Sequence, residues 1–243
     1  MPALKGLGHA GQDALALKQL ESLNLDWYYA WRSRPTVDHP GFVPMVRDPR
    51  KLLQENAIKY VTESLPVTGS DCLLGFNEPD LKGQANMTTG RAVELWPQLE
   101  ATGLRLGAPA TIKPDAWWIG EFMRKAKIKG LRIDFMPVHI YGWPNADDFL
   151  RKIQRMHDKY KLPIWVTEYA VADWKATATV KNRYSRSQVN EFMEATIKGM
   201  NGLGFVERYA WKTRKPGDIA MGSSTLFHTD GSLTSTGKLY ATL

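Results

Sequence analysis

The sequence predicts a single-domain (β/α)8 barrel, an α/β fold of the TIM-barrel type, and three observations indicate it. Short apolar runs alternate with longer amphipathic stretches along the chain, a rhythm typical of parallel βα units. Eight such runs and seven intervening helical stretches can be counted, the number that a closed barrel requires. A length of 243 residues suits one barrel, and no linker rich in Pro, Gly or Ser divides it. We therefore treat residues 1–243 as one domain.

The first half of the chain supplies four of the eight predicted strands. They lie at residues 7–10, which form the weakest run, and at residues 25–31, 41–46 and 72–77. Leucines and alanines within residues 12–24 indicate the first helix. Asp48 and Pro49 are a capping residue and a proline typical of a helix start. That helix is expected to continue through Leu65, because apolar residues recur at every fourth position.

The second half supplies the other four predicted strands. They lie at residues 104–109, 134–141, 164–167 and 205–211. Pro97 is expected to kink or end the helix that precedes the first of them. Asp115 and Ser187 are predicted to cap two of the following helices, and Asn145 is predicted to start a third. A short helix from about Thr236 is expected to close the chain.

Composition excludes several classes of protein. No apolar run is long enough to cross a membrane, so no membrane partner is expected. Cys72 is the only cysteine, which excludes internal disulfides and cysteine-rich metal sites, and its place in an apolar run favours a buried, inert thiol. No apolar stretch follows Lys5, so no signal peptide is predicted. The alternatives are a cytoplasmic protein and a secreted protein whose leader has been removed.

The net charge of +7 raises the question of an acidic partner. A basic surface is compatible with nucleic acid or with an acidic polymer. The densest basic run, residues 124–132, falls at the end of a predicted helix, where cations suit the helix dipole. The other basic residues are spread along the chain, and no nucleic-acid-binding module is present. We therefore expect no nucleic-acid partner. A monomer is also expected.

Two of the predicted strands lead directly to a glutamate. Glu78 follows the fourth strand and Glu168 follows the seventh. Parallel barrels present their chemistry at the carboxyl ends of the strands, and these two ends face each other across the barrel mouth. A glycosidic bond is cleaved when one carboxyl group gives a proton and a second opposes the positive charge on the sugar. Glu78 and Glu168 are therefore the candidate catalytic residues of a sugar-cleaving enzyme.

Three polar neighbours complete the candidate site. Asn77 directly precedes Glu78, and an amide there is able to bind the sugar hydroxyl next to the reacting carbon. His139 and Tyr141 alternate along the sixth strand, so both side chains point to one side. Tyr141 is predicted to donate a hydrogen bond to Glu168. His139 is predicted to reach the mouth, and the alternative is a core histidine bound to a backbone carbonyl.

Tryptophans at strand ends provide a third indication. Trp31, Trp143 and Trp211 each lie at or just past the carboxyl end of a predicted strand. Flat aromatic rings in such positions stack on the apolar faces of glucosyl rings. The alternative is that these rings fill the core. We predict that all three contact the substrate.

Three motifs resemble a known family. They are Leu-Gly-Phe-Asn-Glu-Pro-Asp at residues 74–80, Val-His-Ile-Tyr-Gly at residues 138–142 and Trp-Val-Thr-Glu-Tyr-Ala at residues 165–170. In this order they resemble the glycosyl hydrolase catalytic-core proteins of glycoside hydrolase family 128. The similarity extends from about Leu7 to Tyr240.

The resemblance implies a retaining (β/α)8 hydrolase that cleaves β-1,3-glucan, such as laminarin or curdlan, with endo action as the expectation. It implies Glu78 as the acid/base, Glu168 as the nucleophile, and neither a metal nor an organic cofactor. The alternative is a protein that binds β-glucan polysaccharide or oligosaccharide on the same barrel with little turnover. The presence of both glutamates argues for the enzyme.

Overall fold

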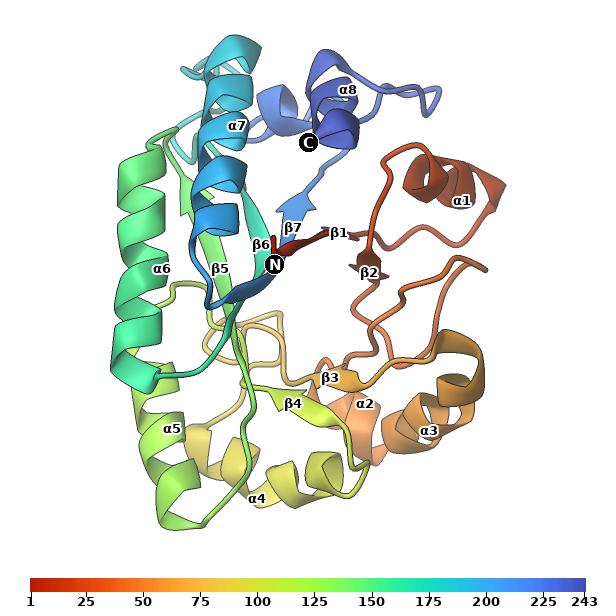
Figure 1. Cartoon of the computed structure of the whole chain (residues 1–243), viewed down its shortest axis with the longest axis vertical. Coiled ribbons are helices and arrows are strands. Elements are labelled where there is room, and N and C mark those ends of the chain that lie inside the picture. Colours follow the sequence, from red (N-terminus) through yellow and green to blue (C-terminus); the bar gives the residue numbers. More distant parts are fainter.

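The computed structural model describes residues 1–243 as a ring of parallel strands surrounded by helices (Figure 1). The strands are β1 (Leu4–Gly8), β2 (Trp27–Tyr29), β3 (Cys72–Leu74), β4 (Arg105–Gly107), β5 (Met136–Gly142), β6 (Ile164–Val171) and β7 (Val206–Lys212). The helices are α1 (Ala14–Glu21), α2 (Pro49–Leu53), α3 (Ala57–Thr68), α4 (Thr89–Glu100), α5 (Trp117–Ile128), α6 (Ala146–Tyr160), α7 (Arg186–Gly202) and α8 (Ser235–Thr242), with a 3-10 turn, η1, at Gly222–Ser224.

Isolated β-bridges connect neighbouring segments of the ring where no continuous strand pairing is formed. Five strands pair in the order β2-β1-β7-β6-β5, and β3 pairs with β4, all in parallel. The predicted strand at 41–46 contributes isolated bridges from Phe42 to β2 and from Met45 to β3. Gly107 of β4 bridges to Phe135, just before β5. With the 42–45 segment as the third position, the eight positions form the predicted (β/α)8 barrel.

Side chains alternate between two apolar layers on the two faces of the ring. A cluster of 51 buried residues fills the space between strands and helices. A second cluster of nine fills the barrel interior: Trp27, Tyr29, Val43, Met45, Cys72, Leu74, Phe135, Trp165 and Ala210. Cys72 is thus a buried thiol, as predicted, and burial raises its pKa to about 12. The alternation decides which residues at the strand ends reach the barrel mouth.

Strand β1 begins three residues earlier than predicted because glycines occupy its inward positions. A Cβ atom on Gly6 would lie 2.3 Å from the Trp27 indole, and one on Gly8 would lie 2.8 Å from the Trp31 ring. Large aromatic side chains from β2 and from Trp31, just beyond it, therefore fill the space that β1 leaves free. A strand with two inward glycines has little apolar pattern, which explains the weak signal in the sequence.

Helix starts agree with the sequence where the capping residue directly precedes the helix. Asn145 accepts the backbone N–H of Asp148 at the start of α6, as predicted. Helix α7 is capped by Ser185 in a capping box with Gln188, so the prediction of Ser187 is wrong by half a turn.

Two further expectations about helices are corrected. Helix α5 follows Ala116 without a side-chain cap, so Asp115 does not cap it. The helix predicted to run through Leu65 is divided into α2 and α3, because Asn56 takes a left-handed conformation with φ 51°. Pro97 lies inside α4, which continues for less than one turn beyond it. The final helix starts close to the predicted place, with Thr234 as its cap.

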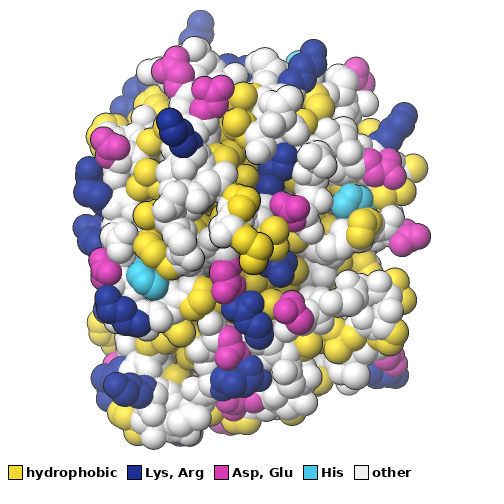
Figure 2. Space-filling model, in the orientation of Figure 1, with side chains coloured by type: hydrophobic (Ala, Val, Ile, Leu, Met, Phe, Trp, Pro, Cys, Tyr) yellow, Lys and Arg dark blue, Asp and Glu magenta, His cyan; other side chains and the backbone are white.

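One face of the molecule carries charges of both signs. On the face seen in Figure 2, Lys and Arg side chains lie interspersed with Asp and Glu side chains. None of the helices combines the length and the apolar character that a bilayer span requires.

Candidate functional site

A hollow of about 800 Å³ lies at the carboxyl ends of the strands, and it brings most of the predicted site residues together. Its lining includes Glu78, Glu168, Asn77, Trp31 and Tyr141. A second hollow of about 510 Å³ adjoins it and shares four lining residues with it: Ala10, Trp31, Lys212 and Arg214. The two hollows form one elongated cleft across the barrel mouth.

Glu78 reaches the cleft through an unusual backbone conformation. It lies just beyond β3, and its φ of 44° is in the left-handed region that residues with a side chain seldom adopt. This conformation costs roughly 1–2 kcal/mol. Its N–H donates to the carbonyl of Ala110 at 2.7 Å, and Asn77 bridges to the same residue. The neighbouring segment therefore holds the Glu78 backbone in place.

Glu168 reaches the cleft because strand β6 contains a bulge. Val138 of β5 pairs with Val166, but the next pair is His139 with Glu168, so Thr167 is left out of the register. Such an extra residue re-aims the side chain that follows it. The hydroxyl of Tyr29, inside the barrel, donates to the carbonyl of Thr167 at 3.0 Å and holds the bulge. Without the bulge, Glu168 would point to the helix layer.

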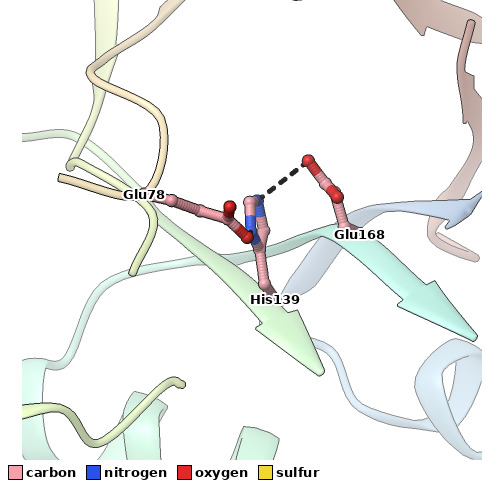
Figure 3. A group of neighbouring side chains, drawn as sticks. All are labelled: Glu78, His139 and Glu168. Carbon is pink, nitrogen blue, oxygen red and sulfur yellow. Dashed lines mark hydrogen bonds and ion pairs between the residues drawn. The ribbon is translucent and has the colours of Figure 1, made fainter. Parts of the chain in front are cut away.

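His139 lies between the two carboxylates (Figure 3). Its Nδ1 shares a hydrogen bond of 3.0 Å with Glu78 Oε1. Its Nε2 lies 3.5 Å from Glu168 Oε1, an electrostatic contact rather than a regular hydrogen bond. His139 is fully buried and does not line the cleft, so its placement gives no support for a direct contact with substrate. It binds side-chain carboxylates instead of a backbone carbonyl.

Glu168 is surrounded by groups that favour its ionised form. The indole N–H of Trp31 donates to Oε1 at 2.9 Å, and the hydroxyl of Tyr141 donates to Oε2, as predicted. The ammonium of Lys212 lies 3.9 Å from Oε2. Burial acts to raise the pKa of Glu168, but the charges of His139 and Lys212 and the two hydrogen bonds outweigh it and lower the pKa to about 2. Glu168 is therefore a carboxylate at neutral pH.

Glu78 has a different set of partners. His139 is the only side chain that bonds to it, and no lysine or arginine lies within 4 Å of its carboxyl group. One carboxyl oxygen of Glu78 lies within 4.8 Å of one from Glu168. The site thus combines one carboxylate fixed by several donors with a second that has a single side-chain partner.

Asn77 presents an unpaired acceptor beside this carboxylate pair. The residue is buried to 2% exposure, and its Oδ1 has no hydrogen-bond partner within the protein. Its Nδ2 lies 3.4 Å from Gln84 Oε1. A buried amide oxygen without a partner is costly unless a ligand or water satisfies it, so Asn77 suits a ligand hydroxyl.

The three predicted tryptophans occupy different places. Trp31 lines the cleft, in agreement with its predicted position. Trp143 is 57% exposed and lies outside the cleft lining. Trp211 is completely buried among Tyr169, Phe192 and Tyr240, and its indole N–H donates to the carbonyl of Ser224. The prediction that Trp211 contacts substrate is therefore wrong.

Strand parity explains the error at Trp211 and reveals a residue that the sequence reasoning missed. Ala210 points into the barrel, so Trp211 points to the helices and Lys212 returns to the mouth. Alternation of side chains from the inward Ala210 therefore selects Lys212, and not Trp211, as the residue of β7 that reaches the cleft.

Trp174 also lines the cleft, with its ring 6.0 Å from that of Tyr141. It follows β6 in a loop, where the sequence carries no periodic signal.

Glu78, His139 and Glu168 together present atoms of the type that bind metal ions. A cation held among them would also face the Lys212 ammonium. The oxygens of Glu168 already accept hydrogen bonds from Trp31 and Tyr141. This set of donors suits a carboxylate pair joined by an imidazole better than a metal centre.

Comparison with known proteins identifies relatives over almost the whole chain. The family model described as "Glycosyl hydrolase catalytic core" matches residues 6–240. A mutant of a family 128 (subgroup I) endo-β-1,3-glucanase from Amycolatopsis mediterranei, solved in complex with laminaripentaose, is 32% identical, with a TM-score of 0.85 and 98% coverage of each chain. A family 128 (subgroup VII) oligosaccharide-binding protein from Trichoderma gamsii is 22% identical, with a TM-score of 0.73 over 99% of this chain and 93% of that one, and shares the fold.

A curated relative is considerably longer. "Alkali-sensitive linkage protein 1" of Schizosaccharomyces pombe is 28% identical over 227 residues, which cover 89% of this chain and 40% of the relative. The chain thus spans less than half the length of that protein. The match over residues 6–240 and the similarity to the bacterial structure show that the chain belongs to the glycosyl hydrolase catalytic core family, and within it to glycoside hydrolase family 128.

Proposed function

We propose that this chain is a retaining endo-β-1,3-glucanase. The observation that carries the proposal is the short gap between the two carboxyl groups, with oxygens within 4.8 Å. Retaining glycosidases place these groups about 5–5.5 Å apart, whereas inverting enzymes leave about 6.5–9.5 Å for a water molecule. The gap between Glu78 and Glu168 therefore supports direct attack by one carboxylate on the sugar.

The different surroundings of the two carboxyl groups support different roles for them. Glu168, held ionised by its partners, attacks the anomeric carbon while Glu78 gives its proton to the departing glycosidic oxygen. This step forms a glycosyl ester on Glu168. Glu78, now a carboxylate, then takes a proton from water, and the water oxygen displaces Glu168 from the same carbon. Two inversions restore the original configuration.

Neighbouring side chains support this sequence of steps. Trp31 and Tyr141 fix the direction of the Glu168 carboxylate, which keeps the nucleophile aligned. The free Oδ1 of Asn77 supports a hydrogen bond from the hydroxyl next to the reacting carbon. The length of the cleft, which continues into the second hollow, supports binding of a chain on both sides of the cleaved bond and hence endo action.

The proposal is tested by following laminarin hydrolysis with the purified protein by proton NMR and by product sizing. We expect the β-anomer to appear first, together with a ladder of oligosaccharides. Initial release of the α-anomer would contradict retention, and glucose as the sole product would contradict endo action. Binding of laminarin without any release of sugar would favour the oligosaccharide-binding alternative.

Two variants and one control test the residue assignments. We expect Glu78→Gln and Glu168→Gln each to lower kcat by at least about 10²–10⁴-fold. Glu194→Gln makes the same change on the exposed face of α7 and should have no effect. Activity that survives Glu168→Gln would overturn the assignment of the nucleophile.

A further inference from the structure

The cleft carries far more positive than negative charge. Only two carboxylates, Glu78 and Glu168, line the larger hollow. Seven basic residues line it: Arg32, Arg47, Arg50, Lys51, Lys113, Lys212 and Arg214. The adjoining hollow adds Lys215 and no carboxylate. The whole chain has 32 basic and 25 acidic residues, so the cleft is much more basic than the chain that forms it.

Some of this charge is balanced by acidic residues at the edge of the cleft. Arg50 and Lys51 both pair with Glu55. Arg47 lies 3.7 Å from Asp48, and Arg214 lies 3.1 Å from Asp218. These cations are structural in part and do not by themselves call for an acidic ligand.

Three cations of the cleft have no acidic partner. Arg32, Lys113 and Lys215 make no contact within 4.0 Å with any Asp or Glu side chain, as the full set of ion pairs shows. Arg32 and Lys113 are exposed. Their charges therefore add to the field of the cleft without being neutralised.

These three cations lie on both sides of the reacting pair. Arg32 follows β2, Lys113 follows β4, which neighbours the strand of Glu78, and Lys215 follows β7, which neighbours the strand of Glu168. The face seen in Figure 2, by contrast, has intermixed charges. The excess of positive charge in the cleft is thus absent from the face seen in that figure.

A neutral glucan does not account for this arrangement. Sugar hydroxyls accept hydrogen bonds from Lys and Arg, but they bring no countercharge when the cations lose water on binding. Sulfate, phosphate and carboxylate groups supply both the acceptors and the charge. Building on the proposed glucanase activity, we propose that the cleft binds β-1,3-glucan chains that carry anionic substituents, with Arg32 and Lys113 contacting the acidic groups.

Nucleic acid offers the same phosphate chemistry but fits the cleft less well. Glu78 and Glu168 lie at its centre, and Glu168 stays ionised at neutral pH. A continuous phosphate backbone crossing the cleft would meet this carboxylate directly. A glycan with occasional acidic groups can place a neutral residue there and its charges on either side.

The test compares kcat/KM on laminarin, sulfated laminarin and carboxymethylated curdlan of matched length at low ionic strength. We expect at least one anionic substrate to be preferred by about fivefold or more, and the preference to shrink at 0.5 M NaCl because salt screens exposed charges. The sulfated and carboxymethylated arms distinguish which acidic group is accepted. Equal or better turnover of neutral laminarin in both arms would overturn the inference.

Variants locate the effect within the cleft. Arg32→Gln and Lys113→Gln should each lower the ratio of anionic to neutral kcat/KM by up to about fivefold, the usual size of one exposed charge pair. Lys198→Gln removes the same charge from α7, far from the cleft, and should leave the ratio unchanged. A ratio that does not respond to Arg32→Gln or Lys113→Gln would also overturn the inference.

The test separates this inference from the glucanase proposal. Hydrolysis of neutral laminarin without an anionic preference refutes the inference and leaves the glucanase. Absence of hydrolysis on every substrate refutes the glucanase. Binding of the anionic oligosaccharides is measured separately by calorimetry on the Glu168→Gln variant. Stronger binding of a single-stranded oligonucleotide than of the anionic glucan would assign the charge to nucleic acid and overturn the inference.

Discussion

The ammonium of Lys212 lies 3.5 Å from the centre of the Trp31 ring, and the indole of Trp31 donates to the carboxylate that Lys212 approaches. Burial lowers the pKa of Lys212, while Glu168 acts in the opposite direction. The lysine, the ring and the carboxylate thus form one unit, in which a cation stabilises the charge of the proposed nucleophile. Several measurable consequences arise from this unit and from the bulge beside it.

Removal of the lysine charge is expected to shift the acidic limb of the pH–rate profile. The pKa of Glu168 is lowered partly by Lys212, so Lys212→Met should raise it. Because the carboxylate is the reactive form, the variant should lose activity at a higher pH than the wild type, by about 1–2 pH units. The kcat/KM profile on laminarin measures this. Lys198→Met is the control, and an unmoved acidic limb in Lys212→Met would contradict the role of the lysine.

Glu168 is also expected to make folding stability depend on pH. Its pKa falls from 4.5 to about 2 on folding, so the ionised side chain stabilises the fold above about pH 4.5. This contribution is lost as the pH falls from about 5 towards 2. The glutamine in Glu168→Gln cannot titrate. The Tm of this variant relative to that of the wild type should therefore increase as the pH falls from about 5 towards 2. Thermal unfolding from pH 7 to pH 2 tests this, and a Tm difference that is independent of pH would refute it.

Loss of the hydrogen bond that holds the β6 bulge is expected to reduce both stability and turnover. Tyr29→Phe removes the donor to the Thr167 carbonyl in a fully buried place. The unpaired carbonyl should cost about 1–3 kcal/mol of unfolding free energy, and kcat should fall because Glu168 is less well aligned.

Tyr28→Phe is the matched control for this variant. Tyr28 is equally buried, and its hydroxyl donates to the carbonyl of Val37 at 3.0 Å, on the helix side of β2. We expect a comparable loss of stability with kcat unchanged. If both variants had the same kcat, the bulge would not depend on Tyr29 for its alignment.

The two tryptophans Trp31 and Trp211 are expected to respond in opposite ways to replacement by phenylalanine. Trp211→Phe leaves a cavity in the layer between strands and helices and should lower the unfolding free energy by about 1–3 kcal/mol, with KM unchanged. Trp31→Phe removes a donor to Glu168 and should lower kcat/KM with little loss of stability. Chemical unfolding and laminarin kinetics on both variants check this, and an increased KM in Trp211→Phe would contradict its place in the core.

The apolar rhythm of the chain is sufficient to predict the barrel, because most of the buried strands are local runs of apolar residues. The positions of Glu78 and Glu168 at the barrel mouth follow from the same rhythm, since each comes directly after a run. The third barrel position was overestimated because only Phe42 and Met45 form bridges, although the whole segment is apolar. Local pattern reports burial and says little about whether a ladder is continuous.

The parts of the site that were not predicted depend on contacts between distant residues. Side chains alternate along β7 between the barrel interior and the helix layer, and this alternation selects Lys212 for the mouth and places Trp211 in the core. The sequence alone could therefore have avoided that error. The bulge at Thr167 shifts the parity of β6, and it is visible only when β5 and β6 are paired. His139 joins the two carboxylates because the ends of three strands converge, which no single segment of sequence specifies.

The left-handed backbone at Glu78 sets the demands of folding against those of chemistry at a single residue. Glycine or asparagine would adopt this conformation with less resistance, yet neither is able to donate a proton to a leaving group. The barrel is therefore less stable at its proposed acid/base position than a sequence with a relaxed backbone there would be. Selection for thermal robustness alone would tend to replace Glu78, so a library screened only for heat tolerance should accumulate well-folded, inert proteins.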